Sequence, residues 1–138
     1  MKSWIIVETY HNRKEDSKHN FNYLGLHKSV QLKKGIENKD LIFTYVSKVM
    51  KFSDVREVTD NSLIPLPDTF NYEKIFHTCI KTKILKDLKE INWLPANDIF
   101  LRLNAFKNGK KINLILLNAP IKLDEEDSKI IQSYFNKF

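Results

Sequence analysis

Short runs of apolar residues mark the strands in the first half of the chain. Trp4 to Glu8 is compact and rich in β-branched residues, which indicates an opening strand. The run LIFTYVS at residues 41–47 is almost continuously apolar, as in a strand that is covered on both faces. A further strand is predicted from residue 50 to 58, and its apolar residues form one inward row only if a β-bulge interrupts it. That row consists of Met50, Phe52, Val55 and Val58.

Two further strands are predicted in the second half. In HTCIKTKIL, residues 77–85, Ile80, Thr82 and Ile84 alternate with lysines, which is typical of a strand with one wetter face. Pro65 and Pro67 cannot donate ladder hydrogen bonds, and they predict a long connection before this strand. The apolar run INLILL at residues 112–117 predicts the last strand.

Helical patterns lie mainly towards the C-terminus. Asp98 to Phe106 has apolar residues at a helical spacing and is followed by Gly109. A helix beginning at Asp124 has acidic residues in its first turn and apolar residues for burial at 130, 131, 134 and 135. Residues 10–20 are polar and fit a loop or a short exposed helix. A short helical turn is expected from Ser29 through Lys34, with Gly35 ending it in the left-handed conformation. This order predicts one α+β domain over residues 1–138, with a mixed sheet that curls towards a barrel and helices outside it.

Composition limits the partners and the compartment. The chain has 138 residues and a net charge of +6, which favours acidic partners, nucleic acid first. Cys79 is the only cysteine, so no intramolecular disulfide can form and a reducing environment is expected. The apolar start ends at Glu8 and is too short for a signal sequence or a membrane span. We therefore expect a cytoplasmic protein without a membrane partner.

The residues offer little support for catalysis or for a cofactor. The four histidines are scattered without metal-ligand spacing, and Cys79 lies in an apolar strand pattern. The acidic run at 124–127 is explained by its position at a helix start. No glycine-rich phosphate loop is present among only three glycines. We expect neither an enzyme nor a bound cofactor or metal.

One glycine stands in an unusual setting. In HNFNYLGLHKSV, residues 19–30, Gly25 lies between the aromatic residues Phe21 and Tyr23 and the basic pair His27 and Lys28. A glycine in an apolar run marks a backbone that bends or comes close to another group. Aromatic rings beside cations suit recognition of a flipped or single-stranded base, but aromatic residues in a strand are also ordinary core residues. From the residues alone both interpretations stay open.

Several segments together resemble the EVE domain family. They are WIIV at 4–7, NYLGLHKS at 22–29, NKDLIFTYV at 38–46 and LNAPIKLDEEDSKIIQSYF at 117–135, and their order and spacing carry the likeness. EVE domains are similar to YTH domains and belong with the PUA-like barrels. The resemblance implies a PUA-like fold, a curved mixed β-barrel surrounded by helices.

The resemblance also implies a base pocket. YTH relatives hold a methylated adenine in an aromatic cage, and EVE members are thought to receive modified bases. Carried onto this chain, the pocket would comprise Phe21, Tyr23, Leu24, Gly25, Leu26, His27, Tyr45, Val46 and Asn118. The family commonly has a tryptophan directly before the glycine, where this chain has Leu24. Either Tyr23 or Phe21 replaces that indole, or the pocket takes a different ligand.

These observations predict a nucleic-acid-binding module that recognises a modified or flipped-out base of RNA or DNA. Lysine side chains near Gly25 would contact the phosphates; they are Lys28, Lys33, Lys34 and Lys48. The alternative is a sensor or accessory protein for a modified nucleoside or another planar small molecule. A downstream effect would require a partner protein with effector activity.

Overall fold

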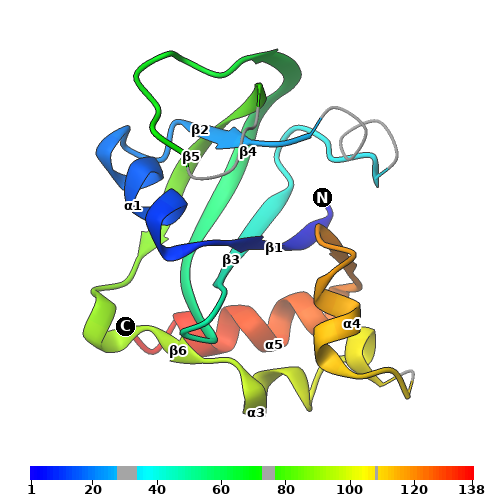
Figure 1. Ribbon diagram of the computed structural model, residues 1–138. Coiled ribbons are helices and arrows are strands. Elements are labelled where there is room, and N and C mark those ends of the chain that lie inside the picture. Colours follow the sequence, from blue (N-terminus) through cyan, green and yellow to red (C-terminus); the bar gives the residue numbers. More distant parts are fainter. Residues whose placement is uncertain (28–33, 73–76, 108) are drawn as a thin grey trace.

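A computed structural model of the protein describes residues 1–27, 34–72, 77–107 and 109–138. The predicted phosphate contacts Lys28 and Lys33 and most of the turn expected at 29–34 lie outside these residues. One mixed sheet organises the described residues, in the order β2-β5-β4-β3-β1-β7, with β6 paired to β4 (Figure 1). The strands are β1 (Ser3–Glu8), β2 (Tyr23–Gly25), β3 (Leu41–Val46), β4 (Lys51–Pro65), β5 (Thr78–Asp87), β6 (Leu94–Pro95) and β7 (Ile121–Leu123).

Helices follow the strands at several points of this sheet. The α-helices among the described residues are α1 (Tyr10–Lys18), α3 (Asn97–Phe100), α4 (Ile112–Leu116) and α5 (Glu125–Phe135). Two short 3-10 helices, η1 (Glu90–Asn92) and η2 (Asn104–Phe106), complete the order. In Figure 1, α5 runs along one end of the sheet, whereas α1 follows directly from the end of β1. The predicted α+β class is confirmed.

The register of the sheet confirms the predicted bulge. β1 and β3 are parallel, and β3 and β4 are antiparallel. Thr44 pairs with Asp54 and Tyr45 pairs with Phe52, so Ser53 is the extra residue of β4. Met50 is not part of the inward row, because it lies in the turn before β4 and is 44% exposed.

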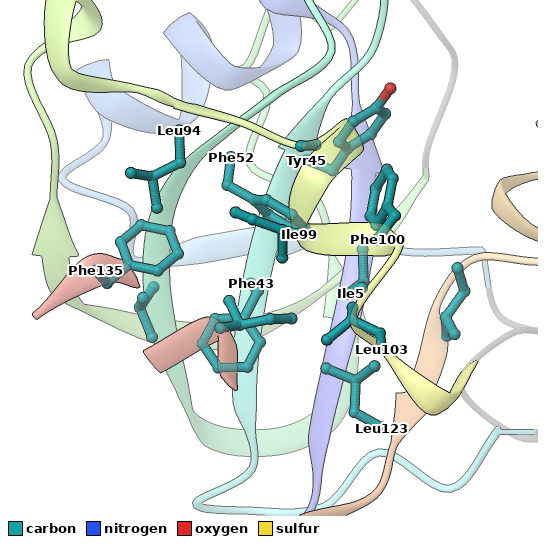
Figure 2. Close-up of a cluster of buried hydrophobic side chains, with 14 of the residues drawn as sticks. Ile5, Phe43, Tyr45, Phe52, Leu94, Ile99, Phe100, Leu103, Leu123 and Phe135 are labelled. Carbon is teal, nitrogen blue, oxygen red and sulfur yellow. The ribbon is translucent and has the colours of Figure 1, made fainter. Parts of the chain in front are cut away.

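Both faces of the central strands are covered, as the apolar run at 41–47 predicts. On one face, Ile5 and Phe43 join the larger core with α3 and α5, and Figure 2 shows Phe52, Phe100 and Phe135 around them. Trp4, Ile6 and Ile42 point to the other face. There they pack in a second cluster with residues from β2, β4 and β5, which are Leu24, Val58 and Ile80. The second cluster fills the inside of the curled sheet.

The C-terminal helix agrees with its prediction. Asp124 caps α5 by accepting a hydrogen bond from the backbone N–H of Asp127 at 2.7 Å. Ile131 and Phe135 are buried, and Ile130 and Tyr134 pack against the same core at partial exposure.

Two predictions of secondary structure are wrong. Residues 112–116 form the helix α4 and not a strand, because a continuous apolar run does not by itself distinguish the two. Ile115 is buried whereas Leu114 is 54% exposed, which is a helical and not an alternating pattern. The single helix predicted from Asp98 to Phe106 is divided into α3 and η2 at an extended Leu103.

Candidate nucleic-acid-binding site

A cavity of about 180 Å³ lies between the end of β1 and the short strand β2. β1 and its continuation into α1 supply one wall, and β2 with the residues after it supplies another. Short segments from the β3–β4 turn, the β4–β5 connection and the approach to β7 close the remaining sides. The lining residues are Ile6, Val7, Glu8, Thr9, Asn12, Leu24, Gly25, Leu26, His27, Ser47, Tyr72, Ala119 and Pro120.

The cavity separates two strand edges. β7 pairs with β1 only from Ser3 to Ile5, so among the described strands Ile6–Glu8 have no neighbour on that side. β2 pairs with β5 along its other edge. The Leu26 N–H donates to the Thr78 carbonyl at 3.0 Å, so the backbone groups of Leu26 face β5. Along β2, residues whose backbone groups face β5 alternate with residues whose backbone groups point away from it. Gly25 is the intervening residue, so its N–H and C=O point away from β5, towards the edge that borders the cavity.

Polar side chains on the β1 side come from one short stretch. Thr9 is the N-cap of α1, and its hydroxyl accepts a hydrogen bond from the Asn12 N–H at 3.1 Å. This cap turns the chain sharply after β1 and places Glu8 and Asn12 in the same wall. Both residues are buried. The cavity is therefore apolar at Leu24 and Leu26 and polar at the opposite wall.

Glu8 connects the cavity to a buried ionic cluster. Arg56 donates to Glu8 Oε1 at 2.9 Å, to Asp16 Oδ2 at 2.8 Å and to Asp54 Oδ1 at 2.8 Å. Arg13 adds contacts to Asp54, at 3.3 Å, and to the Asp87 carboxylate. The hydroxyl groups of Thr44 and Ser53 also donate to Asp54. We call Glu8, Arg13, Asp16, Asp54 and Arg56 the ionic cluster.

Burial and neighbouring charges shift the pKa values of this cluster in opposite directions. Burial and the nearby Asp16 carboxylate raise the pKa of Glu8 well above its ordinary value of 4.5, and Arg56 offsets only part of this effect. Burial also acts to raise the pKa of Asp54, but the Arg56 and Arg13 guanidiniums outweigh it and lower that pKa. The carboxyl group with the raised pKa is the one that lines the cavity.

Tyr72 supplies the aromatic part of the cavity wall. Its hydroxyl donates to Asp16 Oδ1, and burial together with the Glu8 and Asp16 carboxylates raises its pKa. Phe70 packs edge-on against Tyr72, with ring centroids 5.2 Å apart, and His19 stacks on Phe70 at 3.8 Å. The Asn71 N–H donates to Glu15 Oε1 at 3.0 Å, so this segment is held against α1. The ring is thereby fixed in position beside the cavity.

The structure brings four of the residues predicted for the base pocket together around the cavity. They are Leu24, Gly25, Leu26 and His27. Leu24 and Leu26 also belong to the second core cluster, and His27 is exposed. Their role in holding a base stays a prediction, but their common location agrees with the resemblance.

Aromatic residues predicted for the same pocket lie elsewhere. Phe21 is buried with its ring centroid 5.0 Å from the guanidinium carbons of both Arg13 and Arg56, so it supports the ionic cluster. Tyr23 contacts Phe70 edge-on at 5.9 Å and does not line the cavity. The expected replacement of the indole by either ring is therefore not seen in this geometry.

The remaining three residues predicted for the pocket do not line this cavity either. Tyr45 packs in the larger core against Phe52 and Phe100, as Figure 2 shows, and Val46 is buried in that same core. Both residues are buried in that core, and neither lines the cavity. Asn118 is exposed and directly precedes the lining residue Ala119, but it does not line the cavity itself.

Two of the predicted phosphate contacts can be placed beside the cavity. Lys48 is exposed in the β3–β4 turn, next to the lining residue Ser47. Lys34 Nζ donates to the Asn118 backbone carbonyl at 2.8 Å, one residue before the lining segment Ala119–Pro120. Among the described residues, neither ammonium group pairs with a carboxylate in an ion pair.

Several wall residues were not predicted from the sequence. They are Ile6, Val7, Glu8, Thr9, Asn12, Ser47, Tyr72, Ala119 and Pro120. A signal for some of them existed: Thr9 is a residue type that commonly caps the start of a helix, and the polar Glu8 ends an apolar strand. Tyr72 had no such signal, because it belongs to a long connection that only the tertiary structure places next to β1.

The described residues also bear on metal binding, thiol chemistry and membrane insertion. Within the described ranges, no group of three or more His, Cys, Asp or Glu side chains has a geometry that could hold a metal ion. Burial raises the pKa of Cys79 to about 11, and the thiol lies 3.8 Å from the Pro65 carbonyl. Among the same residues, no helix is long and apolar enough to cross a membrane.

Comparison with solved structures identifies the fold. The YTH domain-containing protein mmi1, in complex with RNA, matches with a TM-score of 0.70 at 9% identity, over 98% of this chain and 81% of that chain. The Pho92 YTH domain in complex with m6A matches with a TM-score of 0.65 at 14% identity, over 97% of this chain and 82% of that chain. The YTH domain of the Zygosaccharomyces rouxii MRB1 protein in complex with N6-methyladenosine RNA matches with a TM-score of 0.62 at 15% identity, over 96% of this chain and 86% of that chain.

The fold is therefore of the YTH-domain type, a PUA-like α+β fold, as the resemblance implied. Comparisons of the sequence itself give no match, either to a protein-family model or to a curated protein. At 9 to 15% identity, the likeness concerns the path of the chain and not the side chains of the site.

Proposed function

We propose that this protein is a nucleic-acid-binding module of the EVE type that holds one modified base of an RNA strand in the cavity between β1 and β2. The cavity itself carries this proposal. Its volume of about 180 Å³ is close to the roughly 150 Å³ that suffices to hold one benzene ring in a protein interior. A single planar base suits this space, whereas a longer stretch of strand does not.

The walls offer the contacts that a base needs. Leu24 and Leu26 provide apolar surface on one side, and the Tyr72 ring provides an aromatic surface. The free edge at Gly25 offers a backbone donor and acceptor, and the polar residues Glu8 and Asn12 belong to the opposite wall. The rim of a flat ring could thus be bonded while its faces are covered by apolar groups.

The strand outside the cavity would be held by charge. Lys34 and Lys48 adjoin wall segments of the cavity and are free of carboxylate ion pairs among the described residues. The net charge of +6 favours a polyanionic partner in the same way. Similarity to YTH domains that were solved with RNA supports RNA over DNA.

Binding to a matched panel of short oligonucleotides tests this proposal. The panel contains single-stranded and double-stranded forms, each unmodified or with methylated cytosine, hydroxymethylated cytosine or N6-methyladenine, at two salt concentrations. We expect tighter binding to a modified single strand, weakened by salt because lysine–phosphate contacts release counterions. Binding that ignores both modification and salt would refute the proposal. Binding of free modified nucleosides without preference for oligonucleotides would support the small-molecule alternative instead.

A further inference from the structure

The ionic cluster has more negative than positive charge when all its groups are ionised. Its three carboxylates are Glu8, Asp16 and Asp54, and its two guanidiniums are Arg13 and Arg56. Asp87, which contacts Arg13 and is 45% exposed, adds a further carboxylate at the edge. Three against two leaves one excess negative charge among buried groups, and an uncompensated buried charge is costly.

Glu8 is the member of this cluster that borders the cavity. Asp16 and Asp54 are fully buried behind it, at 0% exposure. Glu8 is faced by Arg56 and Asp54 from β4 and by Asp16 from α1. Among the described residues that line the cavity, the other titratable groups are the Tyr72 hydroxyl, which donates to Asp16, and His27. The excess charge is therefore accessible to a ligand at Glu8.

We infer that the cavity selects a base that carries a positive charge, such as adenine methylated at N1 or cytosine methylated at N3, and that Glu8 is the residue that determines this preference. The inference rests on the proposed function and names the class of base. A cationic base would supply the charge that the cluster lacks, and its delocalised charge would lie beside the Tyr72 ring. A neutral base supplies no such charge.

A proton and the cationic base compete for Glu8 in this arrangement. Burial and the neighbouring Asp16 carboxylate raise the pKa of Glu8, which favours its protonated form when no cation is bound. On binding of the cation, the carboxyl group ionises and the proton is released to solvent. An opposite charge within hydrogen-bonding range shifts a carboxyl pKa by about 1 to 3 units, so ionised Glu8 should favour the cation by about tenfold or more.

Isomeric methylated bases provide a sharp test. N1-methyladenine and N6-methyladenine have the same size, but only the first is a cation near neutral pH, and N3-methylcytosine and 5-methylcytosine form a second such pair. Each base is placed in the centre of the same short single-stranded RNA, and affinity is measured from about pH 6 to 8. We expect at least about tenfold tighter binding of the cationic isomer at the upper pH. Its affinity should rise with pH by up to about tenfold per unit, because one proton is released.

The variant Glu8→Gln removes the titratable carboxyl and keeps an oxygen that can accept from Arg56. We expect it to lose both the preference for the cationic isomer and the pH dependence, so that the two isomers of a pair bind with similar affinity. Glu57→Gln is the matched control, since Glu57 lies on β4 and pairs with the exposed Lys83 at 3.3 Å. Circular dichroism melting establishes that each variant is folded. If Glu8→Gln does not fold, the isomer pairs and the pH series with the unaltered protein still test whether the cavity prefers a cationic base and releases a proton on binding it.

The outcomes separate this inference from the proposed function. Equal or tighter binding of the neutral isomers, or a flat pH profile for the cationic ones, would overturn the role of Glu8 and leave a base-binding cavity. Absence of binding to every oligonucleotide would refute the proposed function itself. A cation preference that persists unchanged in folded Glu8→Gln would also overturn the inference, because lysine–phosphate contacts cannot distinguish isomeric bases.

Discussion

Glu8 and Arg56 are joined by a hydrogen bond of 2.9 Å between Oε1 and Nη2, across the boundary between the cavity and the core. The strand residue Glu8 lines the cavity, whereas Arg56 is fully buried in β4. Changes at either residue should therefore affect both the stability of the fold and the properties of the site.

Replacing Arg56 with methionine should strongly destabilise the protein. The variant keeps the volume of the side chain but leaves the buried carboxylates of Glu8, Asp16 and Asp54 with a single guanidinium. Removal of one partner from a buried ion pair costs about 3 to 5 kcal/mol. Urea denaturation at neutral pH measures the loss. Arg102→Met is the control, because Arg102 contacts Tyr134 at the surface, and a similar small loss in both variants would contradict the importance of the cluster.

The stability of the Glu8→Gln variant relative to the unaltered protein should increase as pH rises. The pKa of Glu8 is raised in the folded protein above its ordinary value of 4.5. The stabilisation from its protonated form is complete below the unfolded pKa and is lost as pH rises through the folded pKa. Glutamine mimics the protonated form at every pH, so the difference in melting temperature between variant and unaltered protein should shift towards the variant above about pH 4.5. A constant difference across that range would show that Glu8 does not titrate with a raised pKa.

Tyr72 and Tyr23 should differ in their effect on RNA binding. Tyr72 lines the cavity, whereas Tyr23 packs against Phe70 outside it. Tyr72→Ala should cost about 1 to 3 kcal/mol of binding free energy if its ring contacts the base, and Tyr23→Ala should cost much less. Fluorescence anisotropy with one modified oligonucleotide compares the two. A larger loss of binding free energy from Tyr23→Ala would indicate that the base binds beside Tyr23, as expected from the sequence, and not in the cavity.

Lys34 and Lys48 should contribute to affinity through charge alone. Each alanine substitution should weaken binding of all oligonucleotides to a similar extent and reduce the slope of log affinity against log salt by about 0.7 to 1. Lys129→Ala is the control, since Lys129 is an exposed residue of α5 that pairs with Glu125. An unchanged salt slope in both cavity-side variants would place the phosphate contacts on another face of the molecule.

Periodicity in the sequence predicts much of the fold because burial imposes it. The strand at 41–47 and the helix from Asp124 bury their apolar residues in the predicted pattern. The run at 112–117 fails because all its residues but Asn113 are apolar, and neither period is visible in such a run. The helix predicted at 98–106 is interrupted because Asp127 of α5 accepts the Asn104 and Ala105 N–H groups at 2.7 and 2.9 Å. That contact depends on a residue far along the chain.

The candidate site could be predicted only where it lies within one segment. Leu24 to His27 are consecutive, so a local signal around Gly25 locates them. Glu8 and Tyr72 come from different elements, and only the curl of the sheet and the ionic cluster bring them to the same cavity. Tyr45 packs in the larger core and does not line this cavity; the likeness locates its strand but not the face of its side chain, because successive side chains of a strand point to opposite faces.

Mapping the bound RNA on the protein by nuclear magnetic resonance tests the central claim most directly. The ¹⁵N-labelled protein is titrated with a short single-stranded RNA that carries one modified base, and backbone amide shifts are followed. We predict the largest shifts at Gly25, Leu26 and Ser47, around the cavity, with little change at the surface of α5. Shifts concentrated on α5 or on the outer face of β5, with the amides of Gly25 and Ser47 unmoved, would contradict the claim that this cavity receives the base.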